Sequence, residues 1–260
     1  MNKITFLNFN KRKAVIVFGI VLVLGFLARW AYYTPQLTYL RGKLVAKMSR
    51  DPKTLGLTLV KLPVVFHRQE HSLSCEIAAL KMALDFQGLN IKESELIENL
   101  QFDSTARKNG IWGDPYTGFV GDIDGKMGVT GYGVYWQPVS DVANKYTYSE
   151  VIENATVQEL AQHLSERRPI VWWGYFGRGK TINWQTSTGR KIVAINGEHA
   201  RVLTGFVGTK ESPTGFYLMD PIYGELFWDT EFLLKNSALF ANSGVVVYSP
   251  EGLFGGDFLE

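Results

Sequence analysis

The stretch Gln69-Glu-His-Ser-Leu-Ser-Cys75-Glu-Ile-Ala-Ala-Leu80 contains the chain's only cysteine. Apolar side chains recur at helical spacing after it, and Gly88 is typical of a helix end, so we predict a helix over residues 74–87. Cys75 would then lie at the helix N-terminus, whose partial positive charge favours the nucleophilic thiolate. A lone cysteine is equally compatible with a small buried apolar residue, so the stretch alone leaves both interpretations open.

Residues elsewhere in the chain favour the nucleophile. His199 opens one strand-like run, and Asp220 ends the next, so an antiparallel hairpin would bring the two together. Asp220 would then hold one imidazole nitrogen, while the other takes the proton of Cys75. Six residues before the cysteine, Gln69 carries an amide that can donate to an oxyanion. We therefore predict a catalytic set of Cys75, His199, Asp220 and Gln69.

The wider pattern predicts an α+β domain with helices first and strands later. Residues 101–149 contain eight glycines and few apolar runs, so we expect long ordered loops there. Further helices are expected over 93–100, 156–166 and 230–240. Strands are expected over 57–66, where Pro63 favours an edge strand, and over 170–175, 191–195, 200–207, 215–219 and 244–248.

The N-terminal part has a different composition. An uncharged apolar run covers residues 14–28 directly after Lys11, Arg12 and Lys13, and aromatic residues extend it to position 33. We predict a cytoplasmic basic segment (1–13), a transmembrane anchor (14–33), a stalk or linker (34–56) and a domain (57–260) outside the cytoplasm. Cleavage of a secretory signal peptide is the alternative, although Arg29 and Trp30 make a poor cleavage site.

The charge distribution excludes one class of partner. The chain has a net charge of +2, but residues 1–50 hold nine basic and no acidic residues, which leaves the remainder with a net charge of −7. An acidic domain has no general attraction for nucleic acid, so we expect no nucleic-acid partner.

Two motifs indicate other chemistry. Residues 174–181 fit the phosphate-binding loop of nucleotide hydrolases, which requires a helix directly after Thr181. The residues that follow favour a strand and turns instead, and a glycine-rich hairpin is the alternative. His67, His71 and Cys75 lie four residues apart, a spacing that would align zinc ligands on a helix. Because the predicted helix begins only near Ser74, we expect no metal site.

Several motifs together resemble a known family, the family thirty-nine-like peptidases, relatives of the papain-like peptidases that cleave bacteriocin leaders. The resemblance covers about residues 60–250. Its motifs are Gln69 with Ser72-Leu-Ser-Cys75, Trp112-Gly-Asp-Pro115, Gly118-Phe-Val-Gly121, Gly131-Tyr-Gly-Val-Tyr135, Gly197-Glu-His-Ala200 and Asp220-Pro-Ile-Tyr-Gly224. One departure is Glu76, which stands where better-known members have glycine.

The resemblance implies a papain-like cysteine peptidase fold, in which a helical part with the nucleophile at a helix N-terminus packs on an antiparallel sheet. It implies hydrolysis of peptide bonds, a peptide or protein substrate and no cofactor. We expect Trp112, Gly113, Asp114 and Glu198 to contribute to substrate binding. An inactive surface module that binds peptides in the same cleft is the alternative, since Glu76 would raise the pKa of the thiol or crowd the oxyanion site.

Overall fold

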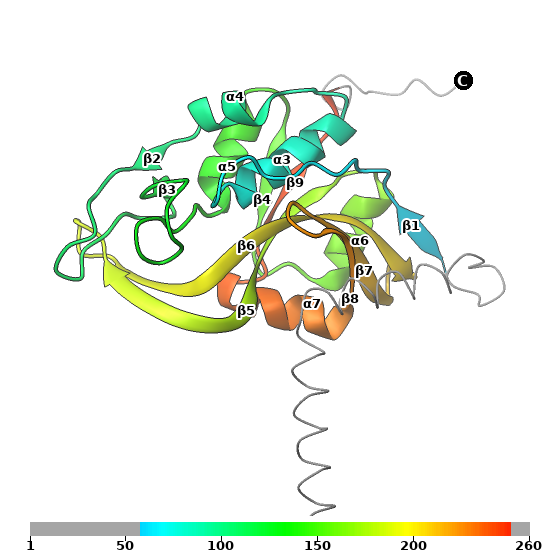
Figure 1. Ribbon diagram of the computed structural model, residues 1–260. Helices are drawn as coiled ribbons and strands as arrows, with labels where there is room; N and C mark the ends of the chain where they lie inside the picture. The colour runs from blue at the N-terminus through cyan, green and yellow to red at the C-terminus, as the bar shows by residue number, and fades with distance from the viewer. Residues whose placement is uncertain (1–57, 251–260) are drawn as a thin grey trace, which may run out of the picture.

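A twisted antiparallel sheet forms the centre of the protein, and helices pack on both of its sides (Figure 1). The computed structural model describes residues 58–250. The seven-stranded sheet has the order β4-β9-β5-β6-β7-β8, with β1 beside β6. Its strands are β1 (Leu59–Lys61), β4 (Ser149–Ile152), β5 (Ile170–Gln185), β6 (Lys191–Gly208), β7 (Pro213–Asp220), β8 (Gly224–Asp229) and β9 (Gly244–Val247). The predicted α+β class is confirmed.

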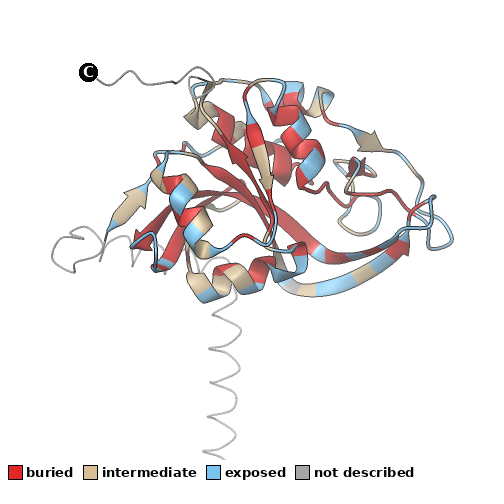
Figure 2. Ribbon diagram, turned by 180° about the vertical axis from the view of Figure 1, so that it is seen from behind, coloured by how far each residue is buried: buried red, intermediate tan, exposed pale blue. Residues whose placement is uncertain are grey.

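Helices cover both faces of this sheet. They are α3 (Cys75–Phe86), α4 (Glu93–Glu98), α5 (Trp136–Ala143), α6 (Val157–Ser165), α7 (Thr230–Ser237) and the 3₁₀ helix η2 (Ala238–Phe240). In Figure 1, α3, α4 and α5 lie together above the sheet, and α7 lies below it. Because both faces are covered, the central strands are buried on both sides (Figure 2). The run from Ile170 to Trp173 is therefore continuously apolar rather than alternating.

Helix α3 is the most deeply buried helix near the site. Its residues from Ile77 to Leu80 are at most 1% exposed, and it contacts both β5 and β6. The small side chains of Ala78, Ala79 and Ala83 allow the helix to approach the sheet closely, while each fully buried leucine or methionine stabilises the fold by about 1.5–3 kcal/mol. The helix predicted over 74–87 is confirmed, and its position is held by packing on both strands.

Other predicted elements are also confirmed. Helix α6 begins with a capping box in which Thr156 and Glu159 exchange side-chain hydrogen bonds with each other's backbone N–H groups. The edge strand predicted over 57–66 is confirmed only in part, because β1 covers Leu59–Lys61 alone. Among the described residues, β1 pairs only with β6, next to the point where the pairing of β6 with β5 ends.

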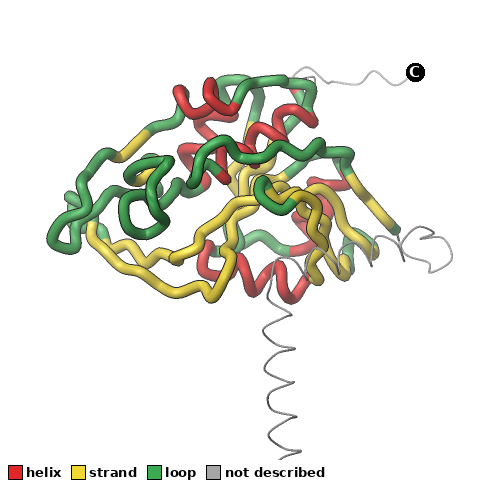
Figure 3. Tube along the Cα trace, viewed as in Figure 1, coloured by secondary structure: helices red, strands yellow, loops and turns green. Residues whose placement is uncertain are grey.

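The prediction of loops throughout residues 101–149 was wrong in part. Helix α5 occupies 136–143, and β4 begins at Ser149. Pro138 concealed this helix, but it lies in the first turn, where its missing N–H group costs little. The loops proper carry only a short parallel pair, β2 (Phe102–Asp103) with β3 (Phe119–Val120). They are ordered because they pack beside the far end of the β5–β6 hairpin, where Trp112 N–H donates to the carbonyl of Gln185 (Figure 3).

The glycine-rich segment 174–181 is part of β5 and not a phosphate-binding loop. A register shift lies between Tyr175 and Lys180, where Gly177 and Gly179 have positive φ values, and the strand then continues to Gln185. The helix that a phosphate-binding loop needs is therefore missing after Thr181. The glycines form an irregularity that bends the hairpin.

The sequence analysis did not predict strand β8, which covers Gly224–Asp229.

The predicted segments 1–13, 14–33 and 34–56 lie outside the described residues, as do position 57 and residues 251–260 of the predicted domain. Among residues 58–250, no helix has both the length and the apolar character that a membrane span requires.

Candidate active site

Cys75 is the first residue of α3 and lies against strand β6. Its side chain is 4% exposed. The Sγ–H group donates to Oε2 of Glu76 at 3.2 Å, and the backbone N–H of Ala200 donates to the sulfur. Ala200 directly follows His199 on β6, so the packing of α3 on this strand places the cysteine against the backbone next to the predicted histidine, although the two are far apart in the sequence.

His199 and Asp220 meet between adjacent antiparallel strands. The register pairs Val202 with Met219, so that the last residue of β7 lies beside the segment 199–201 of β6. Nε2 of His199 is 3.0 Å from Oδ2 of Asp220, and both side chains are buried. When Nε2 carries the proton that it donates to Asp220, Nδ1 is the basic nitrogen left for a thiol proton.

Arg201 is a site residue that the sequence analysis missed. Its Nε donates to the same Oδ2 of Asp220 at 2.7 Å, and the side chain is 3% exposed. The other carboxylate oxygen, Oδ1, accepts the backbone N–H groups of Ile222 and Tyr223. The available signal was spacing, because residues two apart on a strand lie on the same face, which puts Arg201 beside His199.

These contacts set the charges of the histidine and the aspartate. Burial opposes ionisation of Asp220, but the adjacent imidazole and guanidinium outweigh it and hold its pKa well below the ordinary value. Burial lowers the pKa of His199, an effect that Asp220 counteracts only in part. The imidazole is therefore neutral at pH 7, the state in which it can accept a proton.

The expectation that the helix terminus lowers the pKa of Cys75 was wrong. Burial raises this pKa well above its ordinary value, and the carboxylates of Glu76 and Glu198 raise it further. The helix dipole supplies only a partial positive charge, and its effect on the sulfur is outweighed by burial and by the negative charge that Glu76 and Glu198 carry. Cys75 is therefore a thiol at rest in this structure.

Gln69 lies in the extended segment before α3. Its backbone N–H donates to the carbonyl of Pro221, which ties the segment to the residue after Asp220. Its side-chain Nε2 donates to the carbonyls of His71 and Ser72 at 2.7 and 3.0 Å. Both amide hydrogens are thus engaged within the loop, and the predicted oxyanion contact requires one of them to change its acceptor.

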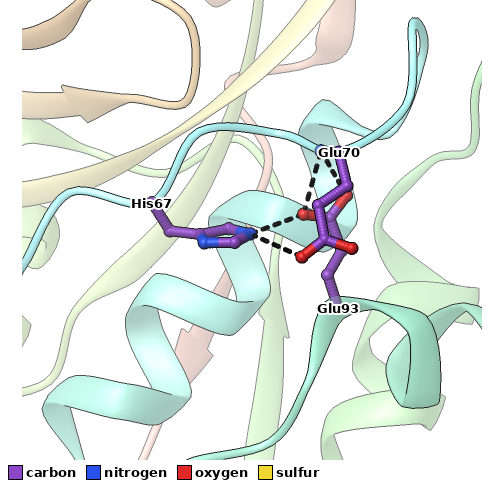
Figure 4. Close-up of side chains that lie close together, drawn as sticks. All are labelled: His67, Glu70 and Glu93. Carbon is purple, nitrogen blue, oxygen red and sulfur yellow. Dashed lines mark hydrogen bonds and ion pairs between the residues drawn. The ribbon is translucent and has the colours of Figure 1, made fainter.

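Glu93, the first residue of α4, anchors the loop that carries Gln69 (Figure 4). Its buried carboxylate accepts hydrogen bonds from Ser74 Oγ at 2.5 Å and from the backbone N–H of Glu70 at 3.2 Å. The same carboxylate contacts Nε2 of His67 at 2.7 Å. The sequence offered no signal for this role, because nothing local relates Glu93 to the residues before Cys75. A buried carboxylate with several donors is expensive to disturb, so it fixes the approach to α3.

His67, His71 and Cys75 do not lie on one helix, as the spacing of zinc ligands would require. Because α3 begins at Cys75, the two histidines are loop residues, and His71 bonds to Asp124 at 2.9 Å. Within residues 58–250, three potential ligand atoms lie within 4.8 Å of one another in the groups His67-Glu70-Glu93 and Cys75-Glu76-Glu198.

The residues predicted to bind substrate lie in two places. Trp112 is 1% exposed and packs on Trp184, whose Nε1 donates to the carbonyl of Gly113. The backbone N–H of Asp114 donates to the carboxylate of Asp103, and the carboxylate of Asp114 forms an ion pair with Arg190. These groups hold the loops to the β5–β6 hairpin. Glu198 instead lies at the cysteine, where its side chain is 1% exposed. Direct substrate contact stays a prediction for all four.

The fold, in which a helix that begins at Cys75 packs on an antiparallel sheet, is that of the papain-like class. Residues 61–234 match the Peptidase_C39 like family. The chain belongs to this family, which confirms the resemblance found in the sequence.

Two known proteins are similar to this chain. The uncharacterized protein YvpB of Bacillus subtilis strain 168 is 28% identical over 157 residues, which are 58% of each chain. The match therefore spans less than two thirds of that relative. A candidate C39-like peptidase from Bacillus anthracis has a solved structure with a TM-score of 0.62 and 23% identity, covering 74% of this chain and 98% of that one. This likeness supports the fold.

Proposed function

We propose that this protein is a cysteine peptidase that hydrolyses peptide bonds with Cys75, His199 and Asp220. The observation that carries the proposal is the buried pair of His199 and Asp220 next to the backbone N–H that contacts Cys75. Membership of a family of peptidases supports the same reaction.

The reaction proceeds in two steps. Nδ1 of His199 takes the thiol proton while Sγ attacks the carbonyl carbon of the substrate, and the imidazolium then gives this proton to the leaving amine. His199 next takes a proton from water, which attacks the thioester and releases the acid and the thiol. Asp220 orients the imidazole and stabilises its charged form, as in related triads.

Two side chains must move before this reaction. The thiol has to turn from Glu76 toward His199, and Nε2 of Gln69 has to exchange a loop carbonyl for the oxyanion, which the backbone N–H of Cys75 would also bind. Catalytic hydrogen bonds commonly tighten only when substrate is bound. We infer that substrate binding near residues 69–75 drives both changes.

The test is hydrolysis of peptide libraries by the full chain, purified in mild detergent. The wild type is expected to cleave, and Cys75→Ala to be inactive. Glu98→Gln, an exposed substitution on α4 outside the triad, is the control and is expected to retain activity. Equal turnover by the wild type and Cys75→Ala would refute the nucleophile.

A second candidate function is a catalytically inactive module that binds peptides. The observation that favours it is the resting thiol, which faces Glu76 and Glu198 and has a raised pKa. This candidate predicts peptide binding without cleavage, with the same affinity in Cys75→Ala. Any cleavage that depends on Cys75 would exclude it.

We also propose that residues 14–33 anchor the protein in a membrane, with the domain outside the cytoplasm. The apolar run and the basic residues before it support this topology. Membrane fractionation and protease digestion of intact cells test it. Digestion of the domain in intact cells is expected, whereas protection would place the domain inside. Release of the domain into the medium would favour signal cleavage.

A further inference from the structure

Two glutamates next to the nucleophile lie in mutual contact without solvent. Glu76 on α3 is 0% exposed and Glu198 on β6 is 1% exposed. One oxygen of each carboxyl group lies within 4.8 Å of an oxygen of the other and of Sγ of Cys75. Neither residue was expected to interact with the other.

The hydrogen bonds of this cluster are incomplete if both groups are ionised. Oε1 of Glu76 accepts the backbone N–H of Val134 at 2.7 Å, and Oε2 accepts the thiol of Cys75. For Glu198, no N–H or O–H group among residues 58–250 donates to either oxygen. The carboxyl group of Glu76 is the neighbour with which Glu198 can form a hydrogen bond, and two carboxyl groups form such a bond only through a proton.

The surroundings supply too little positive charge to balance two anions. The titratable and charged groups around the pair are Cys75, Arg201, Tyr132 and Tyr135. Arg201 is already paired with Asp220 at 2.7 Å, so its charge is largely compensated. The two tyrosines are neutral phenols that bond to each other at 3.0 Å. Buried like charges in contact cannot both ionise, and a proton is the remaining way to balance them.

The backbone is built to accommodate this contact. Gly133 passes beside the pair, and a Cβ added there would lie 2.5 Å from Oε1 of Glu76 and 2.7 Å from Oε2 of Glu198. Its φ of +143° also suits glycine. The carbonyl of the next residue, Val134, accepts Nε1 of Trp173 at 3.0 Å, which fixes this segment to β5.

We propose that Glu76 and Glu198 share a single proton, and that this carboxyl pair holds the thiol of Cys75 through Oε2 of Glu76 so that its charge opposes ionisation of the nucleophile. Glu198 is a positioning residue because it acts through Glu76. The meaning of the pair for catalysis rests on the proposed function, but the proton itself can be measured without any substrate.

The test uses the full chain, whose single cysteine makes thiol alkylation specific for Cys75. We compare the pH dependence of iodoacetamide alkylation in the wild type, in Glu76→Gln/Glu198→Gln and in the control Glu98→Gln, an exposed glutamate on α4. The double variant keeps the shape of both side chains and removes their charge. Its alkylation midpoint is expected to fall by at least about one pH unit, or tenfold in rate at a fixed pH below the midpoint. An unchanged or higher midpoint overturns the proposal.

Infrared spectroscopy of the wild type tests the shared proton directly and does not depend on a variant that folds. A carbonyl band of a protonated carboxyl group, sensitive to exchange into D₂O, is expected at neutral pH. The band is expected to shift in each single glutamine variant, because the remaining carboxyl group has no carboxylate with which to share its proton, and to be absent in Glu76→Gln/Glu198→Gln. Absence of the band in the wild type refutes the pair. If the band is present while peptides are not cleaved, the shared proton stands and the peptidase proposal fails.

Discussion

Nε2 of His199 lies 3.0 Å from Oδ2 of Asp220, and neither side chain is accessible to solvent. The contact holds the imidazole ring through Nε2, which leaves Nδ1 as the nitrogen that can accept a proton. The contact joins β6 and β7, whose antiparallel pairing places the two residues side by side. Arg201 stabilises it by donating a hydrogen bond to the same oxygen of Asp220.

Asp220→Asn tests the importance of that contact for turnover. The amide cannot stabilise an imidazolium, and it can hold the ring in the wrong tautomer, so kcat is expected to fall by about 10²–10⁴-fold. The measurement is peptide hydrolysis, with circular dichroism to verify folding. A folded variant with unchanged kcat would exclude Asp220 from the mechanism.

Arg201→Ala tests the stability of the buried ion pair. Removing one partner leaves Asp220 as an uncompensated buried charge, so the free energy of unfolding is expected to fall by about 3–5 kcal/mol. Urea denaturation gives this value. The control is Arg190→Ala, which removes a half-exposed ion pair with Asp114 and is expected to cost less than about 1 kcal/mol. Equal losses in the two variants would contradict the structure.

The carboxyl pair predicts an unusual dependence of stability on pH. Burial raises the pKa of Glu76 to about 7, and burial with the charge of Glu76 raises that of Glu198 well above its ordinary value. Between the unfolded value of about 4.3 and about 7, the folded state therefore binds more protons than the unfolded state. Stability from this source is complete below about pH 4.3 and is lost as the pH rises toward about 7.

Between about pH 4.3 and 7, the free energy of unfolding is expected to fall by up to about 1.4 kcal/mol per pH unit for one proton. Urea denaturation at several pH values in this range measures this slope. Glu76→Gln/Glu198→Gln is expected to remove the slope. Asp220 acts in the opposite direction and at lower pH: its lowered pKa gives stability above about pH 3.9 that is lost on further acidification. A wild type whose stability rises steadily from pH 4.3 to 7 would argue against the raised pKa of the pair.

Gly133→Ala tests the close approach of the backbone to the pair. A methyl group there meets both carboxyl groups, and the residue has a positive φ, so we expect a loss of about 2–4 kcal/mol in the free energy of unfolding. Gly88→Ala is the control, because Gly88 also has a positive φ but a Cβ there has no atom within 4 Å. Its cost is expected to be about 1–2 kcal/mol. Equal costs would mean that the contact is unimportant.

Glu93→Ala tests the anchor of the loop before the nucleophile. The variant leaves the hydroxyl of Ser74 and the N–H of Glu70 without their acceptor, which is expected to cost about 2–4 kcal/mol and to slow peptide hydrolysis. Glu98→Ala on the exposed side of the same helix is expected to change neither quantity. If Glu93→Ala behaves like Glu98→Ala, the anchor has no role.

The sequence predicted well those helices whose start and end depend on interactions between residues close together in the chain. The helix that begins at Cys75 follows from apolar spacing and from Gly88, and α6 follows from the capping box of Thr156 and Glu159. The α5 helix was missed because Pro138 and the many glycines before it are usually signals for loops, and its stability comes from burial that local sequence does not reveal.

By itself, the sequence determined the fold class, the family and the order Gln69, Cys75, His199, Asp220, because residue type and spacing carry that information. Only the tertiary structure decided the charge state of the site. Whether Cys75 is a thiolate or a thiol depends on the burial and on the direct contact of Glu76 with Glu198, which come from a helix and a strand far apart in the chain. Electrostatic energies depend on distance and solvent access in three dimensions, and neither quantity is encoded in local spacing.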